Sequence, residues 1–342
     1  MTEVKIIKQE ENGIAFFEIS NEMLKVRMTN LGCHILSVFA PDKNGVLGDV
    51  VLGYEDVTDC YRDDSCMGAI VGRVANRIGN ASFVLNGKTY PLKANCGRHH
   101  LHGGEKGFDR QIFDYKIVDN GIRFHYHSSH MEEGYPGNLD LDVTFLLEGA
   151  KLSILYEAET DRDTILNPTC HIYFNLSGKR ENISAHRMRI RADEIACVDG
   201  EGLAYGEYLK VENTPFDFRC MRELGNALEA EHIQLKNAGG IDHSFLLSGQ
   251  EDVIELYHRE SGRRLLISTD MPVVQVYTAN FLAGGCPGKG GAPYDNRAGV
   301  ALETQFVSNS IQIEKEPKVI LRKGQKMQSR TDYTFACITD EG

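Results

Sequence analysis

The sequence predicts an all-β fold of antiparallel strands with few short helices. Three observations support this prediction. Turn signals lie between runs of β-forming residues in several places, apolar and polar residues alternate inside those runs, and helical spacing is rare. Adjacent hairpins with so little helix are typical of antiparallel sheets.

Strand and turn signals follow one another along the chain. The segment 23–28, MLKVRM, alternates as a half-buried strand does. An Asn-Gly pair between β-formers is the strongest short hairpin signal. Only 221–237, MRELGNALEAEHIQLKN, has helical spacing, with Leu224, Leu228 and Ile233 on one face. Four hairpins are predicted, at 83–92 around Asn86-Gly87, at 114–128 around Asn120-Gly121, at 146–160 around 148–150, and at 252–269 around Ser261-Gly262.

Length, charge and cysteine usage exclude several classes of protein. No linker or low-complexity segment divides the 342 residues, so we expect one domain over residues 1–342. The net charge of −12 and the lack of a basic cluster argue against a nucleic-acid partner. No window approaches about 18 uninterrupted apolar residues, so no membrane span is expected. Nine scattered cysteines, no CxxC pair and no apolar signal core in the first residues favour reduced thiols and a cytoplasmic location.

A histidine stands inside a segment that otherwise reads as a core strand, NPTCHIYFNLSG (167–178). A row of apolar side chains suits a hydrophobic core, whereas the alternate row carries hydrogen-bonding groups on a stiff element. A lone strand histidine is more often structural than catalytic, so the rest of the chain has to decide its role. Alternation places Cys170, Ile172, Phe174 and Leu176 on one face and His171, Tyr173 and Asn175 on the other.

Other polar residues interrupt apolar or glycine-rich segments. Glu303 lies within VALETQF (300–306), where a carboxylate is costly unless it is hydrogen-bonded or functional; it could also be a half-exposed strand glutamate. The pair Gly103-Gly104 follows His102 and permits a tight turn or the close approach of a ligand. The other candidates are Arg73, Asn76 and Arg77 in GAIVGRVANRIG, His99 and His100 in GRHHLHGG, Asp242 and His243 in GGIDHSF, and Gln275 and Tyr277 in VVQVYTANF.

Metal and cofactor signals are weak. Histidines at 125, 127 and 130 could supply two ligands from one strand face, but their spacing fixes no third ligand. The glycine-rich loop 284–294 lacks the Walker A pattern because Lys289 is followed by Gly290, and GxGxxG and GxSxG motifs are absent. The remaining histidines, carboxylates, arginine and amides predict acid–base chemistry on a polyhydroxy substrate without metal or cofactor.

Several of these segments resemble one family in both order and rough spacing. GRVANRI, NCGRHHLHGGEKGFD, GYPGNL, NPTCHIYFNLSG, GGIDHSF, VQVYTANF and ALETQ are similar to motifs of the aldose 1-epimerase (galactose mutarotase) family, from about residue 20 to the end. The resemblance implies a large antiparallel β-sandwich of the galactose mutarotase type, with a sugar bound in a cleft. It also implies an isomerase that interconverts the α and β anomers of free aldoses such as galactose or glucose and uses no cofactor.

The resemblance also implies a role for individual residues. Glu303 of LETQ corresponds to a general base that removes the proton from the C1 hydroxyl. His171 corresponds to a general acid that protonates the ring oxygen, and His102 of LHGG to a residue that helps to polarise that oxygen. Asn76, Arg77, Asp242 and Gln275 match sugar-binding positions, whereas Arg73, Tyr173 and Asn175 are expected to support or line the site.

The chain departs from the family pattern at a few positions, and more than one function is compatible with its motifs. Cys170 and Ile172 flank His171 where the family often has Asn and commonly has Ser, and residues 306–309 replace a Pro-Asp pair.

A glycoside hydrolase would use Asp242 and Glu303 as its two carboxylates, but would leave the histidines without a task. A non-catalytic sugar-binding or regulatory module would keep the same pocket, as would an epimerase acting on a different sugar or on a sugar phosphate. The expected partner is a monosaccharide, and the oligomeric state is not readable from the sequence.

Overall fold

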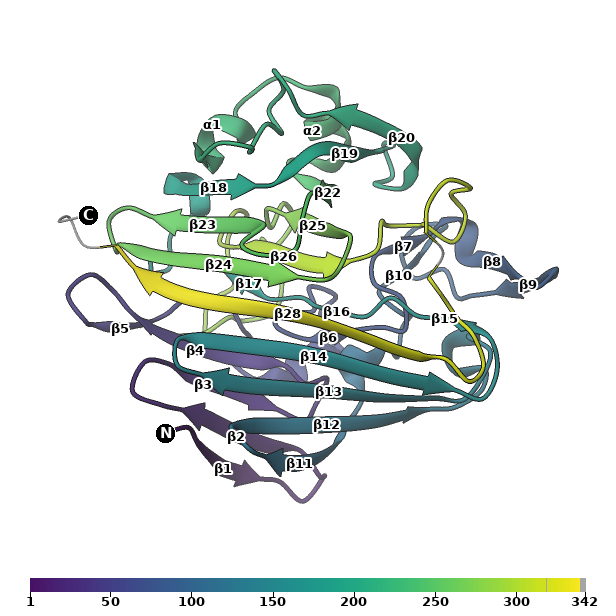
Figure 1. Ribbon diagram of the computed structural model, residues 1–342, viewed down its shortest axis with the longest axis horizontal. Helices are drawn as coiled ribbons and strands as arrows, with labels where there is room; N and C mark the ends of the chain where they lie inside the picture. The colour runs from purple at the N-terminus through teal and green to yellow at the C-terminus, as the bar shows by residue number, and fades with distance from the viewer. Residues whose placement is uncertain (318, 339–342) are drawn as a thin grey trace.

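The computed structural model describes residues 1–317 and 319–338 and consists mainly of β-strands (Figure 1). Within these residues, the ladders between the labelled strands are antiparallel. The prediction of an antiparallel all-β fold is therefore confirmed. Three sheets dominate, with nine, six and five strands.

The nine-stranded sheet spans the molecule (Figure 1). Strand β28, near the end of the chain, pairs with β14 on one side and β24 on the other, and so joins the two halves of this sheet. In spatial order the strands are β11 (Asp114–Val118), β12 (Gly121–Ser128), β13 (Leu139–Glu148), β14 (Lys151–Thr160), β28 (Lys326–Cys337), β24 (Arg263–Thr269), β23 (Ile254–His258), β18 (His186–Ile190) and β21 (Arg222–Glu223).

Two further sheets come from separate parts of the chain. The five-stranded sheet is formed by consecutive strands at the N-terminus: β1 (Glu3–Gln9), β2 (Ala15–Ser20), β3 (Lys25–Thr29), β4 (Ile35–Pro41) and β5 (Leu47–Asp49). The six-stranded sheet has the order β17 (Tyr173–Phe174), β26 (Val300–Gln305), β25 (Val273–Tyr277), β22 (Asp242–Leu247), β19 (Ala192–Val198) and β20 (Ala204–Lys210).

Short ladders and helices connect the three sheets. The ladders pair β6 (Ile70–Val71) with β16 (Thr169–Cys170), β7 (Arg77–Ile78) with β10 (His100–Leu101), β8 (Ser82–Leu85) with β9 (Lys88–Pro91), and β15 (Thr164–Ile165) with β27 (Ile320–Leu321). Short 3₁₀ helices are η1 (Val57–Tyr61), η2 (Gly79–Ala81), η3 (Phe108–Arg110), η4 (Glu132–Gly134) and η5 (Ile183–Ala185), and the α-helices are α1 (Leu224–Leu228) and α2 (Ile233–Ala238). Over the described residues, no helix has the length and apolar character needed to span a membrane.

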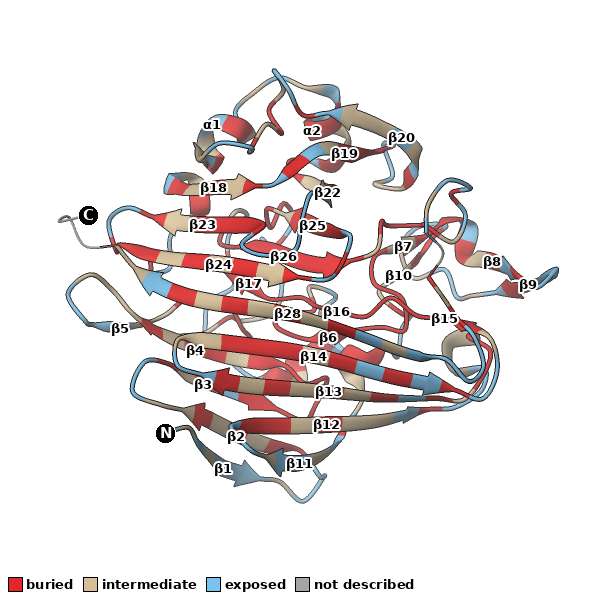
Figure 2. Cartoon of the chain, in the orientation of Figure 1, coloured by how far each residue is buried: buried red, intermediate tan, exposed pale blue. Residues whose placement is uncertain are grey.

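The nine-stranded sheet packs against the other two sheets around one apolar core. Phe17 of β2 contacts Phe124 of β12 with ring centroids 5.7 Å apart, and Phe174 of β17 contacts Tyr333 of β28 at 5.6 Å. Along β13 and β28, buried residues alternate with more exposed ones, whereas all of β26 is buried (Figure 2). The alternating strands have one wet face, and β26 is covered on both faces. This arrangement is the expected β-sandwich.

The four predicted hairpins are confirmed, but the predicted helix is wrong in its extent. The hairpins are β8–β9, β11–β12, β13–β14 and β23–β24, and β3 matches the alternating segment 23–28. In 221–237 the structure has two short helices separated by residues 229–232. His232 is extended, and its ring accepts a hydrogen bond from the backbone N–H of Gln234, so it caps α2. Because this break resets the helical phase, Ile233 is 62% exposed instead of buried with Leu224.

The strand predicted over 170–176 is also interrupted. Only Thr169–Cys170 and Tyr173–Phe174 are strand residues, and they pair with different partners, β6 and β26. Between them, His171 keeps its backbone bonds, because its N–H donates to Ala69 and its carbonyl accepts from Gly68. The apolar row of the prediction is kept, since Cys170, Ile172, Phe174 and Leu176 all lie in the main apolar core. The polar row is divided, because His171 and Tyr173 line one cavity and Asn175 lines another.

Candidate active site

A cavity of about 370 Å³ is lined by residues of the six-stranded sheet, of the β7–β10 ladder and of the loops that surround them. This volume falls in the usual range for small-molecule sites, roughly 300–1,000 Å³. The lining residues are Arg62, Asp63, Asp64, Ser65, Asn76, Arg77, Leu101, His102, His171, Tyr173, Asp242, Tyr277, Phe281, Leu282, Gly285 and Glu303.

The register of three strands brings the polar residues of the sheet together. Glu303 of β26 is paired with Gln275 of β25, and Gln275 is paired with Ser244 of β22. One step along the sheet, Tyr277 pairs with Asp242. Directly paired residues on antiparallel strands project to the same face, as do residues two apart along a strand. All five side chains therefore share one face, and the apolar core covers the other.

Glu303 and His171 form a buried pair at this cavity. Oε1 of Glu303 is 3.4 Å from Nε2 of His171, and the side chains are 2% and 5% exposed. Burial, with a smaller contribution from Asp242, raises the pKa of Glu303 well above its usual value. Burial lowers the pKa of His171 to about 4. Oε2 of Glu303 has no hydrogen-bond partner among the described residues, so a ligand that donates a hydrogen bond would satisfy it.

His102 approaches His171 from a loop whose backbone is unusual. Asn76 and His102 have φ of +62° and +51°, in the left-handed region. The N–H of Asn76 donates to Nδ1 of His102 at 3.2 Å, so the neutral ring carries its proton on Nε2. Burial and the neighbouring His171 lower the pKa of His102. A Cβ at Gly103 would overlap the carbonyl oxygen of Gly72, so this glycine allows a close approach of two backbone segments that places His102.

Arg77 and Asp242 form the second charged pair of the cavity. Nη1 of Arg77 is 3.8 Å from Oδ2 of Asp242, and Nε of Arg77 is buried without a hydrogen-bond partner in the described structure. Nε2 of Gln275 donates to Oδ1 of Asp242 at 2.6 Å. Burial raises the pKa of Asp242, while Arg77 and Gln275 act in the opposite direction. The cavity therefore offers a ligand the donor groups of Arg77 and the acceptor oxygens of Asp242 side by side.

The structure brings together six of the predicted site residues at the cavity: Asn76, Arg77, His102, His171, Asp242 and Glu303. Gln275 lies outside the lining set and contacts Asp242 instead. Tyr173 lines the cavity, as expected for a supporting residue, and its hydroxyl donates to the carbonyl of Ser65 at 3.0 Å.

The other two residues expected near the site are structural. Arg73 is buried, and its guanidinium donates to the carbonyl groups of residues 128, 129, 136 and 137. Nδ2 of Asn175 donates to the carbonyl groups of Glu181 and Ala298, and Asn175 lines a different cavity. Neither side chain faces the candidate site, because each is held by backbone carbonyls of its own neighbourhood.

Two loops of the cavity were not found from the sequence. Residues 62–65 and 281–285 contribute to the lining, and Oδ2 of Asp63 accepts a hydrogen bond from the N–H of Cys286 at 2.8 Å. This bond ties the two loops together across more than half of the chain. Phe281 ends the segment VQVYTANF and the glycine-rich loop begins at Gly284, but neither pattern indicates the contact with residues 62–65, which depends on long-range folding.

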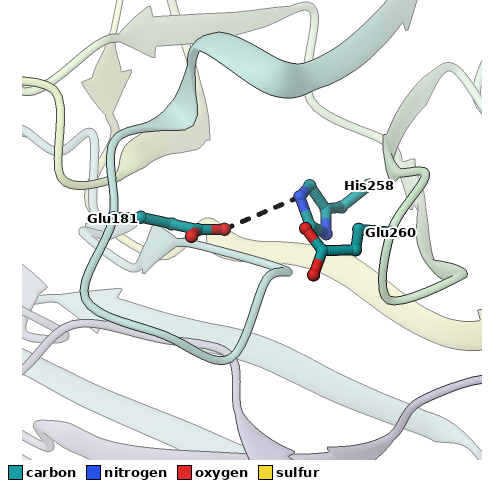
Figure 3. Close-up of side chains that lie close together, drawn as sticks. All are labelled: Glu181, His258 and Glu260. Atoms are coloured by element: carbon teal, nitrogen blue, oxygen red, sulfur yellow. Dashed lines mark ion pairs between the residues drawn. The ribbon is translucent and has the colours of Figure 1, made fainter.

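One group of side chains in the described residues has the spacing of metal ligands, and it lies away from the cavity. Glu181, His258 and Glu260 bring one ligand atom each within 4.8 Å of one another (Figure 3). Glu260 already pairs with Nζ of Lys179 at 2.9 Å, and no second observation indicates an ion there. The histidines at 125 and 127 pair with Asp142 and Asp140 on the solvent side of β12 and β13. Neither group supports a metal role at the candidate site.

Comparison with known proteins assigns the family. The profile of the family described as aldose 1-epimerase matches residues 16–334. This chain belongs to the aldose 1-epimerase family. The bovine (Bos taurus) galactose mutarotase is 38% identical over 324 residues, which cover 94% of this chain and 93% of that protein. The aldose 1-epimerase of Escherichia coli is 33% identical, over 92% of this chain and 93% of that protein.

Solved structures of aldose 1-epimerase relatives have the same fold. An aldose epimerase homologue from C. elegans superimposes with a TM-score of 0.89 and 30% identity, over 96% of this chain and 100% of that one. Galactose 1-epimerase from Lactobacillus acidophilus gives 0.85 and 26%, over 98% and 99%. The resemblance stated from the motifs and the galactose mutarotase type of sandwich are thus both confirmed.

Proposed function

We propose that this protein is an aldose 1-epimerase that interconverts the α and β anomers of free aldoses, with galactose and glucose as the first candidates. The buried pair of Glu303 and His171 at a cavity of sugar size carries this proposal, since one group can accept a proton while the other gives one. The names of the relatives, galactose mutarotase and aldose 1-epimerase, agree with it. The reaction is an isomerisation that needs only proton transfer, so these side chains suffice for it.

The roles of the two residues follow from the chemistry of ring opening. Glu303 takes the proton of the C1 hydroxyl, and His171 gives a proton to the ring oxygen as the bond between C1 and that oxygen breaks. The open-chain aldehyde then turns about the C1–C2 bond. Closure on the other face of the carbonyl returns both protons and gives the opposite anomer. In this proposal His102, whose Nδ1 accepts a backbone N–H so that Nε2 carries the proton, donates a hydrogen bond to the ring oxygen.

In this proposal, the bound sugar brings Glu303 and His171 into the protonation states that the reaction requires. Burial by itself favours a protonated Glu303 and a neutral His171. A C1 hydroxyl that donates to the unpartnered Oε2 stabilises the carboxylate form of Glu303. The proton is then carried by His171, which is the form required to protonate the ring oxygen. A raised carboxylate pKa also makes Glu303 a stronger base than an exposed glutamate.

The chemistry of the cysteines supports a cytoplasmic location for the enzyme. All nine cysteines are free thiols, and several are buried in the core. Free thiols persist in reducing compartments, whereas secreted proteins commonly pair them as disulfides. We therefore extend the proposal to a cytoplasmic enzyme that acts on a free monosaccharide.

Polarimetry on freshly dissolved α-galactose and α-glucose tests the function directly. The wild-type protein is expected to accelerate the approach to the anomeric equilibrium, and Glu303→Gln to reduce that acceleration by at least about 10²-fold. Sugar binding measured by calorimetry provides the control. Ordinary affinity with no acceleration by the wild type would contradict the proposal and favour a binding module.

A further inference from the structure

A buried serine lies beside the cavity-lining residues on the same face of the six-stranded sheet. Ser244 is 2% exposed, lies outside the set of lining residues, and is paired with Gln275 in the ladder between β22 and β25. Its hydroxyl donates to Oε1 of Gln275 at 2.6 Å. The oxygen of Ser244 accepts the backbone N–H of Ser308 at 3.5 Å, which leaves the single hydroxyl proton for Gln275. The acceptor end of the Gln275 amide is therefore directed towards Ser244.

The orientation of this amide decides what Asp242 meets. With its oxygen facing Ser244, Gln275 presents its NH₂ group to Asp242, and Nε2 donates to Oδ1 at 2.6 Å. A carboxylate accepts such a bond, whereas an amide turned by 180° would set its oxygen against Oδ1. Two acceptors at that distance repel unless the carboxyl group takes up a proton. Asp242 itself lines the cavity.

The other charged and titratable groups near Asp242 come from neighbouring elements. Arg77 of β7 is 3.8 Å away and favours the carboxylate. Tyr277 of β25 and Glu303 of β26 also lie close enough for the Asp242 carboxylate to raise the pKa of each. His243, on the same strand, accepts a hydrogen bond from the backbone N–H of Asp242 through Nδ1. Arg77 and the hydrogen bond from Gln275 thus both favour the charged form of Asp242 against the effect of burial.

We propose that Ser244 is a positioning residue that fixes the amide of Gln275 and thereby keeps Asp242 as a hydrogen-bond acceptor for a sugar hydroxyl. The identity of the ligand rests on the function proposed above. Gln275 does not line the cavity, and its role is then to hold Asp242 in its acceptor form. Loss of the Ser244 hydroxyl should weaken sugar binding, with little effect on the proton transfers at Glu303 and His171.

A second buried serine provides a matched control. The hydroxyl of Ser308 donates to Oδ1 of Asn76 at 2.9 Å, so it also orients the amide of a residue in the site. The same Oδ1 accepts the N–H of Arg77 at 2.7 Å. The Asn76 amide is therefore held twice, and the Gln275 oxygen has only the Ser244 hydroxyl as a hydrogen-bond donor in the described structure. Ser308→Ala should consequently change KM by less than about 2-fold.

The kinetic test compares wild type, Ser244→Ala, Ser244→Thr and Ser308→Ala between pH 6 and 9. Ser244→Ala is expected to raise KM about 10-fold at pH 6 with kcat nearly unchanged. The excess should be largest at the lowest pH, because loss of the hydrogen bond from Gln275 favours the protonated form of Asp242. Ser244→Thr keeps the hydroxyl and should restore a value close to wild type. An unchanged KM at every pH, or a fall in kcat alone, would overturn the proposal.

A second readout separates this proposal from the proposed function. The Asp242 carboxyl is titrated by ¹³C NMR in the protein without sugar, and its signal is assigned by comparison with Asp242→Asn. Ser244→Ala should move the midpoint to higher pH, and Ser308→Ala should not. This result is independent of whether the wild type accelerates mutarotation. If Ser244→Ala does not fold, Ser244→Cys replaces it with a smaller expected shift, because a thiol is a weaker donor; an unmoved midpoint in both variants would refute the role.

Discussion

His171 and His243 have similar surroundings and differ in how far the protein satisfies their rings. Both are buried, and each packs against an aromatic ring, Tyr173 at 4.8 Å for His171 and Phe216 at 4.7 Å for His243. Burial lowers the pKa of both, to about 4 and about 3. Both also come from segments that the sequence singled out as candidates, NPTCHIYFNLSG for His171 and GGIDHSF for His243.

The difference lies in their hydrogen bonds. Nδ1 of His243 accepts the N–H of Asp242 at 3.0 Å, so Nε2 carries the proton and donates to Oε1 of Gln234 at 3.1 Å. His171 faces Glu303 at 3.4 Å, beyond ordinary hydrogen-bond length, and the other oxygen of Glu303 has no partner in the described structure. Burial and a lowered pKa are thus shared by a histidine bonded through both ring nitrogens and by the histidine proposed as the catalytic acid. Of these two, it is His171 that has a ring nitrogen, Nδ1, without a hydrogen-bond partner in the described structure.

The largest expected effect is on the rate. His171→Asn should reduce mutarotation by about 10²- to 10⁴-fold, because the variant keeps a hydrogen-bonding side chain but cannot transfer a proton. His243→Asn should lose less than about 10-fold per folded molecule. Polarimetry on both variants, with the folded fraction checked by circular dichroism, makes the comparison. Equal losses in the two variants would show that the difference in hydrogen bonding does not separate their roles.

The next effect concerns stability in acid. The folded-state pKa of His243, about 3, lies below the unfolded value of 6.5. The unfolded chain therefore binds more protons between these values, and the stability contributed by neutral His243 is complete above pH 6.5 and is lost as pH falls. By pH 4 the loss should reach roughly 3 kcal/mol. Urea unfolding between pH 4 and 8 should show that the wild type has a higher free energy of unfolding than His243→Asn at pH 8, and that this difference decreases as pH falls. A difference that stays constant with pH would contradict the prediction.

Local signals were enough to predict much of the fold and part of the site. Each hairpin depends on a turn and two short runs that are adjacent in sequence, such as Asn86-Gly87 between β8 and β9. The sandwich and most of the site residues came from the combined motifs around His102, His171 and Glu303. Those motifs contain residue types that the reaction needs, so the resemblance could be tested against the chemistry.

What could not be predicted depends on contacts between distant segments. The strand around His171 is interrupted because its two halves pair with β6 and β26, which lie far apart in the sequence. The break between α1 and α2 depends on a histidine cap that periodicity does not reveal. Gln275 matched a sugar-binding position, but only the tertiary structure places it behind Asp242. Loop 62–65 meets loop 281–285 through Asp63, a contact without any sequence pattern.

A smaller effect is expected when Glu303 is replaced by a residue that cannot ionise. The folded-state pKa of Glu303 is raised above the ordinary value of 4.5, so stability falls as pH rises from there through the folded pKa. Glu303→Gln removes this cost and should raise the free energy of unfolding by about 2 kcal/mol at pH 8, with no gain near pH 4. Thermal unfolding at both pH values measures it. In contrast, His243→Asn should lower the free energy of unfolding at pH 8. If Glu303→Gln lowered it as well, Glu303 would be a residue that stabilises the fold.

The smallest effect tests whether the aromatic neighbour matters to the difference between the two histidines. Tyr173→Phe gives His171 the same kind of neighbour that His243 has in Phe216, and it deletes the hydrogen bond to the carbonyl of Ser65. The ring contact with His171 remains, so kcat should stay within about 2-fold of wild type. The 62–65 loop loses one anchor, which should cost about 1 kcal/mol of stability and raise KM a few-fold. Steady-state kinetics and urea unfolding measure the two effects. A large fall in kcat with unchanged KM would mean that the tyrosine hydroxyl, and not only the free capacity of His171 and Glu303, takes part in proton transfer.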